Sequence, residues 1–259
     1  MKVVIWAGGL GSRISEESHL IPKPMIEIGE MPIIWHIMKH YSYYGHHEFI
    51  ICLGYKQHVV KNFFTNYSLY RSDVMVDIKE NKIHVHTDFS EPWKVNLIDT
   101  GLNTGKAGRL SRIRDYIGDE TFAVTYGDGV SDVNINEVIK FHESHGKIAT
   151  ITAVNVPQMK GVLNVDKDGT LSSFREKQNH DDTMINGGYM VLNPKVFSYI
   201  DKDKKEMEFE DEPMQKLYDD GELKAYCHRG FWHCMDTQRE KNLLEKLWND
   251  GVAPWKVWK

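Results

Sequence analysis

The sequence lacks the features on which several classes of protein depend. Only three cysteines occur among its 259 residues, and Cys52, Cys227 and Cys234 form no C-x-x-C pair. An odd number of scattered thiols argues against a disulfide scaffold and fits buried side chains in a reduced compartment. No apolar run approaches the roughly 18 residues of a membrane span, and no signal-peptide pattern precedes the first apolar run. We therefore expect a soluble cytoplasmic protein that binds no membrane.

Excess positive charge is also missing. Lysine and arginine number 32 against 37 aspartate and glutamate residues, which gives a formal net charge of −5. Nucleic-acid binders need a positive field over their surface, so this balance argues against nucleic acid as a partner. Any anionic ligand must be held by local charges. The length suits one large domain with a substantial core, and no repeat, low-complexity tract or linker divides the chain.

A glycine-rich loop follows the first apolar run, residues 3–6. Three glycines fall within the four positions 8–11, so the backbone there can come close to a ligand. The uncovered N–H groups of such a loop attract phosphate, and Arg13 and Lys23 add fixed positive charge nearby. The dinucleotide pattern G-x-G-x-x-G fails at Ile14, and the pattern G-x-x-x-x-G-K-[ST] has no match. The loop therefore predicts a phosphate site of another kind.

Strands and helices alternate after this loop. Apolar spacing predicts a helix over 33–44, a strand over 48–53 and a second helix around 59–64. Repeated units of strand, loop and helix predict a doubly wound parallel sheet, in which ligands bind beyond the carboxyl ends of the strands. The glycine-rich loop lies at such an end. Residues 66–100 break the alternation, and we interpret them as an excursion from the sheet.

Two acidic positions, one near the middle of the sequence and one further on, are candidate ion ligands. A strand over 122–126 ends in Gly127-Asp128-Gly129, where the carboxylate can either reach a bound ion or simply make a turn. Asp236 stands at the start of a predicted helix. Because Thr237 and Glu240 have the spacing of a capping box, Asp236 can alternatively belong to the helix terminus alone. The residues themselves leave both alternatives open.

Short apolar runs after residue 161 predict antiparallel strands that pack on the parallel sheet. They cover 162–165, 171–174 and 189–192. Asn193-Pro194 predicts the start of a further helix. The charge run 202–211 predicts a solvated loop.

Taken together, these motifs resemble those of the sugar-phosphate nucleotidylyltransferases. The signature loop of that family reads G-G-x-G-[ST]-R followed by Lys-Pro-[ML], and residues 8–13 and 23–25 match it. Further motifs stand in the family's order at 127–129, 161, 176–177, 186–188 and 236–237. Other stretches, including 32–39, 91–93 and 253–256, are similar to the branch that transfers cytidylyl groups to glucose 1-phosphate.

The resemblance implies an α/β fold with a Rossmann-like mixed, mainly parallel sheet flanked by helices, and with added antiparallel strands in the C-terminal half. It implies a single domain over 1–259, in which about 1–130 binds the nucleotide and about 131–259 binds the sugar phosphate. It also implies a homo-oligomer, for which the aromatic-rich segment 67–93 is the expected contact surface.

The resemblance further implies transfer of a cytidylyl group from CTP to glucose 1-phosphate, giving CDP-glucose and pyrophosphate for deoxysugar and surface-polysaccharide (O-antigen) synthesis. Arg13 and Lys23 would be catalytic, and Asp128 and Asp236 would hold Mg²⁺. The residues implied to bind the nucleotide are Ala7, Gly8, Gly9, Leu10, Gly11, Ser12, Arg13, Lys23, Gly108, Arg109, Gly127 and Asp128. Those implied to bind the sugar phosphate are Gly161, Glu176, Lys177, Asn186 and Gly187.

Two alternatives accompany this interpretation. One is a cytidylyl- or uridylyltransferase for another sugar 1-phosphate. The other, from a different class, is a non-catalytic regulatory subunit that senses a sugar nucleotide on the same fold. Such a subunit predicts damage at Arg13, Lys23, Asp128 or Asp236, and all four residues are present.

Overall fold

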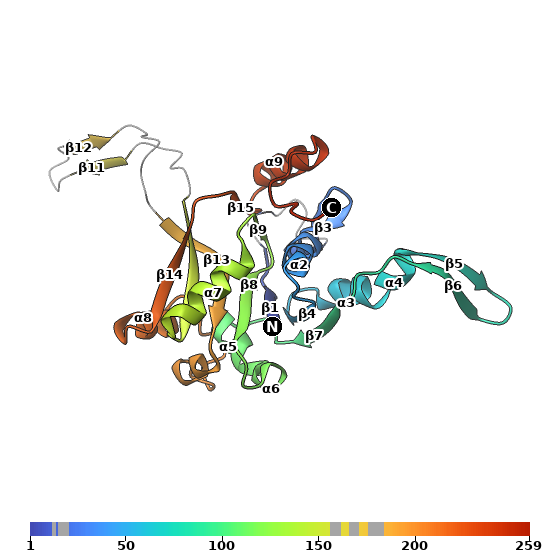
Figure 1. The fold of residues 1–259 in the computed structure, drawn as a ribbon, viewed down its shortest axis with the longest axis horizontal. Coiled ribbons are helices and arrows are strands. Elements are labelled where there is room, and N and C mark those ends of the chain that lie inside the picture. Colours follow the sequence, from blue (N-terminus) through green and yellow to red (C-terminus); the bar gives the residue numbers. More distant parts are fainter. Residues whose placement is uncertain (12–13, 15–20, 156–161, 166–170, 176–183) are drawn as a thin grey trace.

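A seven-stranded mixed sheet forms the centre of the molecule. The computed structural model describes residues 1–11, 14, 21–155, 162–165, 171–175 and 184–259 (Figure 1). The strands run in the order β14-β10-β13-β8-β1-β4-β7. Their bounds are β1 Lys2–Ala7, β4 Glu48–Leu53, β7 Lys94–Asp99, β8 Phe122–Tyr126, β10 Ala149–Asn155, β13 Met184–Leu192 and β14 Leu223–His228.

Strand direction confirms a mainly parallel sheet and corrects one expectation. β1 pairs in parallel with β4 on one side and with β8 on the other. β13 instead runs antiparallel to both of its neighbours, β8 and β10. The antiparallel strand of the C-terminal half thus lies inside the sheet and is not packed on it, because strand pairing depends on partners distant in sequence.

Helices cover both faces of the sheet. The helices in the described part of the chain are α2 Ile33–Tyr43, α3 Gln57–Thr65, α4 Tyr67–Tyr70, α5 Lys106–Arg112, α6 Arg114–Ile117, α7 Ile135–His145, α8 Glu212–Asp219 and α9 Gln238–Asn249, of which α4 lies beside β5 and away from the central sheet (Figure 1). Short 3₁₀ helices span Lys23–Met25 and Pro194–Tyr199. The second of these is the helix predicted to start at Asn193-Pro194, and it is a 3₁₀ helix in which the Asn193 side chain accepts a hydrogen bond from the Lys195 N–H. Among the described residues, no helix has the length and apolar character needed to cross a bilayer.

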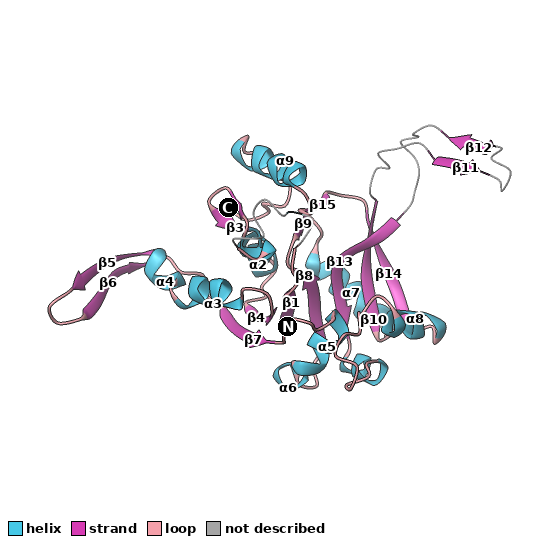
Figure 2. Ribbon diagram, turned by 180° about the vertical axis from the view of Figure 1, so that it is seen from behind, coloured by secondary structure: helices cyan, strands magenta, loops and turns pink. Residues whose placement is uncertain are grey.

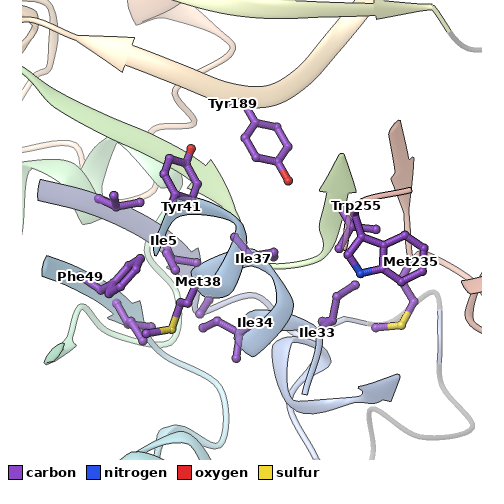
Figure 3. Packing of buried hydrophobic residues seen from close by; sticks show 14 of the residues in the cluster. Ile5, Ile33, Ile34, Ile37, Met38, Tyr41, Phe49, Tyr189, Met235 and Trp255 are labelled. Carbon is purple, nitrogen blue, oxygen red and sulfur yellow. The ribbon is translucent and has the colours of Figure 1, made fainter. Parts of the chain in front are cut away.

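Two apolar cores result from the alternation of side chains along β1. Val3 and Ile5 face the core that α2 covers, whereas Val4 and Trp6 face the core that contains Leu110 of α5. Figure 3 shows the first core, with Ile33, Ile34, Ile37, Met38 and Tyr41 of α2 packed among residues of the sheet and of the C-terminal segment, including Met235 and Trp255. The sheet is thereby fixed on both faces, and its strand ends are held in place.

Within the described residues, four small two-stranded sheets lie outside the central one. β5 Ser72–Asp77 and β6 Lys82–Asp88 form a hairpin that extends far from the central sheet, and β11 Val162–Val165 pairs with β12 Leu171–Arg175 at the opposite end of the molecule (Figures 1 and 2). The first hairpin confirms the predicted excursion over 72–88. Residues 94–99, expected in the same excursion, instead form β7 and pair in parallel with β4 at the edge of the central sheet, because strand pairing depends on partners distant in sequence. Nearer the sheet, β2 Glu27–Ile28 pairs with β3 Met31–Pro32, and β9 Gly129–Ser131 pairs with β15 Trp232–Cys234.

Candidate active site

The carboxyl ends of β1 and β8 lie side by side because these two strands pair in parallel. The glycine-rich loop continues β1, and Gly127-Asp128-Gly129 continues β8, so the two segments meet at one edge of the sheet. A cavity of about 470 Å³ opens there. The residues that line it come from both halves of the chain: Trp6, Ala7, Gly8, Gly9, Gly11, Lys23, Pro24, Thr104, Lys106, Arg109, Tyr126, Gly127, Asp128, Asn186, Glu208, Trp232, Cys234 and Asp236.

Lys23 lies between two carboxylates at this cavity. Its Nζ is 2.6 Å from Asp128 Oδ2 and also contacts Asp236 Oδ1. The residue is only 7% exposed. Burial by itself disfavours the charge, but attraction from Asp128 and neighbouring groups outweighs it, and the pKa of Lys23 is raised. Lys23 is therefore a fixed, buried positive charge at neutral pH.

A tight turn presents Lys23 to the cavity. Pro22 is extended, and its carbonyl accepts a hydrogen bond of 2.8 Å from the Met25 N–H, which closes the 3₁₀ helix Lys23–Met25. Gly127 has to be a glycine here, because a Cβ would lie 2.9 Å from the Trp6 carbonyl oxygen and 3.1 Å from Pro24 Cγ. The close approach of these segments places Lys23 beside Asp128.

Asp236 reaches the same point through a second pairing. β15 pairs with β9 so that Cys234 faces Gly129, and the Met235 N–H donates to the Asp128 carbonyl over 2.9 Å. The ligand atoms of Asp128, Cys234 and Asp236 lie within 4.8 Å of one another. The structure thus brings together the two carboxylates that the sequence singled out, and it adds a thiol whose pKa is raised by burial.

The cap of helix α9 does not depend on Asp236. Thr237 is the N-cap residue, and it forms the predicted capping box with Glu240. The Asp236 backbone N–H also donates to Glu240 Oε2, over 2.7 Å, while the Asp236 side chain turns to Lys23. Of the two interpretations of Asp236, the helix terminus accounts for its backbone and the cavity accounts for its carboxylate.

Arg109 braces the glycine-rich loop from behind. Its guanidinium donates to the carbonyl oxygens of Gly8 at 3.1 Å, Leu53 at 3.0 Å and Gly101 at 2.9 Å. Burial lowers the pKa of Arg109, which is 4% exposed. Arg109 lines the cavity, and these hydrogen bonds show that it connects the ends of β1 and β4.

The charge run 202–211 is only in part the solvated loop that its composition predicts, since residues 202–206 are exposed and residues 207–210 are not. Gly105 donates its N–H to the Lys205 carbonyl over 2.9 Å, and a Cβ on Gly108 would lie 2.2 Å from the same oxygen. Phe209 is 1% exposed, and Glu208 lines the cavity. The expectation was wrong for 207–210 because backbone carbonyls, which composition does not report, accept hydrogen bonds from the start of α5 and hold the run against it. Gly108 itself packs against the run and is not among the cavity-lining residues.

Several cavity-lining residues belong to no motif that the sequence reveals. Lys106 makes ion pairs with Glu208 and Glu210, the latter at 3.1 Å. Tyr126 donates to Glu210 and accepts a 3.2 Å hydrogen bond from Asn186. The glycines around Lys106 are the sequence feature that could have pointed to it. Glu208 and Glu210 could not be singled out, because they lie among many other charged residues in the run 202–211.

The remaining predicted site residues fall into three groups: a closely packed glycine, an exposed leucine and positions outside the described residues. Trp232 Nε1 donates to the Gly187 carbonyl over 2.8 Å, and a Cβ on Gly187 would lie 2.6 Å from Val154 Cγ1, so this glycine serves close packing beside Asn186. Leu10 is 57% exposed. The expected positions that lie outside the described residues are Ser12, Arg13, Gly161, Glu176 and Lys177.

Comparison with known proteins gives consistent matches. The family model described as nucleotidyl transferase matches residues 2–250. A glucose-1-phosphate cytidylyltransferase of Salmonella typhimurium is 51% identical over 259 residues, which cover all of both chains. A UTP–glucose-1-phosphate uridylyltransferase of Synechocystis is 28% identical over 77% of this chain and 51% of its own length. Among solved structures, HddC from Yersinia pseudotuberculosis, complexed with GMP-PN, has a TM-score of 0.68 at 23% identity, covering 95% of this chain and 99% of that one.

Proposed function

We propose the reaction of this protein on the premise that the chain belongs to the nucleotidyl transferase family. It is an enzyme that transfers the cytidylyl group of CTP to glucose 1-phosphate, forming CDP-glucose and pyrophosphate. The observation that carries the reaction type is the convergence of the glycine-rich loop, buried Lys23 and the carboxylates of Asp128 and Asp236 in one cavity. The choice of cytosine as the base and glucose as the sugar rests on the 51% identity to the Salmonella enzyme over the full length.

Charge repulsion is the main obstacle in this reaction. A phosphate monoester has its second pKa at about 6, so the attacking oxygen of the sugar phosphate is already anionic at neutral pH and needs no general base. It attacks the α-phosphorus of the triphosphate, and the bond to the pyrophosphate oxygen breaks. The site must hold two anions in line and offset the charge that builds on the α-phosphate and the leaving group. Lys23 supplies a positive charge fixed in place by its two ion pairs.

The glycine-rich loop is suited to the triphosphate. Gly8, Gly9 and Gly11 line the cavity, and a Cβ on Gly9 would meet nothing within 4 Å, so this part of the loop leaves its N–H groups open to a ligand. Arg109 holds the Gly8 carbonyl and so directs that oxygen away from the phosphates. We assign a direct triphosphate contact to Arg13, on the family pattern alone.

Asp128 and Asp236 fit a divalent cation. Carboxylate and phosphate oxygens are the ligands that Mg²⁺ prefers. The ligand atoms of Asp128 and Asp236 lie within 4.8 Å of each other. With Lys23, the two carboxylates form a centre of net negative charge, which repels a triphosphate unless a cation accompanies it. When bound, Mg²⁺ supplies charge neutralisation to the phosphate oxygens. We therefore propose Mg²⁺ as the cofactor of this site.

The sugar phosphate binds on the side of Asn186 in our proposal. Asn186 lines the cavity from β13, opposite the glycine-rich loop on β1. Glu176 and Lys177 are assigned to the sugar hydroxyls and the sugar phosphate by the family pattern, together with Gly161 and Gly187. We place the reaction in the cytoplasm, where CTP is available, as a source of precursors for deoxysugars and surface polysaccharide.

A substrate panel tests the proposed function. The purified protein with Mg²⁺ is assayed for pyrophosphate release with CTP, UTP, GTP and dTTP, each against glucose, mannose and galactose 1-phosphates. We expect CTP with glucose 1-phosphate to give the highest kcat/KM. Preference for another pair would support the alternative transferase, and no turnover with any pair in the presence of Mg²⁺ would support the non-catalytic subunit.

A further inference from the structure

A chain of hydrogen bonds runs from the charge run 202–211 to the sugar side of the cavity. The Tyr126 hydroxyl donates to Glu210 Oε1 and accepts from Asn186 Nδ2 at 3.2 Å. Asn186 Oδ1 in turn accepts from the Gly188 backbone N–H at 2.9 Å. The side-chain amide of Asn186 is thereby held at both of its ends.

These bonds determine which way the amide faces. A carboxylate cannot donate a hydrogen bond, so the single proton of the Tyr126 hydroxyl goes to Glu210, and its lone pairs face Asn186. The Gly188 N–H requires an acceptor at the other end of the amide. Only the orientation with Nδ2 toward Tyr126 satisfies both neighbours.

The ring of Tyr126 is fixed as well. It stacks on Trp6 with ring centroids 5.6 Å apart, and Trp6 in turn contacts Phe209 at 5.8 Å. Gly188 has φ +78°, and a Cβ there would lie 2.2 Å from Tyr126 Cδ2. The glycine thus gives room for the ring and supplies the N–H that holds Asn186.

Glu210 is tied to the nucleotide side of the site by Lys106, the first residue of α5. Its Nζ lies 3.1 Å from Glu210 Oε2 and also contacts Glu208. Both Lys106 and Glu208 line the cavity. A continuous set of polar contacts therefore connects the start of α5 with Asn186 on β13.

We propose that Tyr126 and Glu210 are positioning residues that orient the Asn186 amide toward a hydroxyl of the sugar phosphate, and that Lys106 anchors this relay. The inference rests on the proposed sugar side of the cavity. An amide has two N–H groups and two lone pairs, and within the described residues one of each remains for a ligand. A sugar hydroxyl both donates and accepts, so an amide held in one orientation binds it better than one that rotates.

The test measures KM for each substrate separately. Tyr126→Phe removes the hydroxyl and keeps the ring stacked on Trp6. We expect KM for the sugar 1-phosphate to rise by about tenfold, the effect of one lost hydrogen bond in a buried network, and KM for the nucleotide to change by less than about twofold. Tyr218→Phe, which removes a hydroxyl from a residue 68% exposed on α8, is the matched control and should leave both KM values unchanged.

A double-mutant cycle separates positioning from general packing. If Tyr126 acts through the amide, Tyr126→Phe should have no further effect on the sugar 1-phosphate KM in an Asn186→Ala background. Glu210→Gln keeps an oxygen that accepts from Tyr126, so it should raise that KM less than Glu210→Ala does. Since these two variants keep the tyrosine, they test the relay even if Tyr126→Phe does not fold.

Equal rises in both KM values, or additive effects in the Asn186→Ala background, would overturn the proposal. The sugar 1-phosphate used is whichever member of the panel the unaltered protein turns over best. A protein that prefers a sugar other than glucose would refute the proposed substrate, and the same KM comparison would still show whether the relay operates. The two failures are therefore distinguishable.

Discussion

The guanidinium of Arg109 occupies the space that a side chain on Gly8 would need. A Cβ built on Gly8 would lie 2.1 Å from Arg109 Nη1, which itself donates to the carbonyls of Leu53 and Gly101. The glycine at the start of the phosphate loop is thus required by a buried cation behind the loop, in addition to any ligand in front of it.

Replacing Arg109 should destabilise the protein. Arg109→Met keeps the length of the side chain but removes the guanidinium hydrogen bonds to the Gly8, Leu53 and Gly101 carbonyls. The Gly8 and Leu53 carbonyls keep only their bonds from Tyr55 and Thr100. We expect a loss of about 2 to 4 kcal/mol in the free energy of unfolding, measured by denaturant titration. Arg71→Met, at an exposed position, is the control and should have little effect. An Arg109→Met protein as stable as the unaltered one would show that the brace contributes nothing.

Lys23 should contribute to both catalysis and metal-free stability. Lys23→Ala removes the positive charge from the reacting phosphates, and we expect kcat to fall on the order of 100-fold or more. It also leaves the carboxylates of Asp128 and Asp236 facing each other, so the melting temperature without Mg²⁺ should drop and Mg²⁺ should restore part of it. Kinetics and thermal melting with and without Mg²⁺ check both effects. Near-normal kcat in a folded variant would remove Lys23 from the mechanism.

Substitutions at Asp236 and at its neighbour Thr237 should have different effects, the first on activity and the second on stability. Asp236→Asn leaves the Thr237 cap intact, so we expect a folded protein with strongly reduced activity that raised Mg²⁺ partly restores. Thr237→Ala, the matched control, should cost about 1 kcal/mol of stability and leave the Mg²⁺ dependence of activity unchanged. If Asp236→Asn keeps full activity at limiting Mg²⁺, the carboxylate has no part in holding the metal.

Buried histidines should make the fold sensitive to acid. Burial lowers the pKa of His36 and of His40 to about 4, and their Nε2 atoms pair with the Ile28 and Val133 carbonyls. The folded pKa of each histidine lies below the unfolded value of 6.5, so the folded state is favoured while the ring is neutral. The contribution of each histidine to the free energy of unfolding, about 3 kcal/mol, is fully present above pH 6.5 and is lost as pH falls toward 4. Melting temperatures across this range should show the loss. His36→Gln should reduce the slope, and His84→Gln, on the exposed hairpin, should not.

The hairpin of β5 and β6 should mediate self-association. Val74 and Val76 face Val85 and Ile83 across the strands, and all four are at least 37% exposed. An isolated two-stranded hairpin is marginally stable in water, so we propose that a second copy of the chain covers this apolar face in a homo-oligomer. Light scattering should show a smaller species for Val76→Lys. His84→Lys, on the other face of the hairpin, should leave the assembly unchanged, and a monomeric unaltered protein would refute the proposal.

The central site could be located from the sequence because each of its main residues follows a recognisable break in periodicity. Asp128 stands between two glycines after a buried strand, and the rule for parallel strand ends places it beside the first loop. Asp236 was ambiguous because a capping box follows it directly, and the structure shows that the backbone and the side chain of this residue have different partners.

The remaining wall of the cavity was not predictable from local patterns. Glu208 and Glu210 lie in a run whose composition indicates solvent exposure, yet carbonyls in that run receive N–H groups from α5, and Phe209 is buried. The position of β13 inside the sheet also escaped prediction, since its hydrophobic pattern fits either an inserted or a stacked strand. Both errors concern contacts between segments far apart in the chain.

The pairing of β9 with β15 has a consequence for protein synthesis. Asp236 is held beside Asp128 by the hydrogen bond from Met235 and by a strand that begins at Trp232. A nascent chain still attached to the ribosome can form β1, β4 and β8 long before that strand emerges. Lys23 then has one carboxylate partner, and the catalytic centre is completed only when β15 and Asp236 have left the exit tunnel, so chains interrupted before β15 remain inactive.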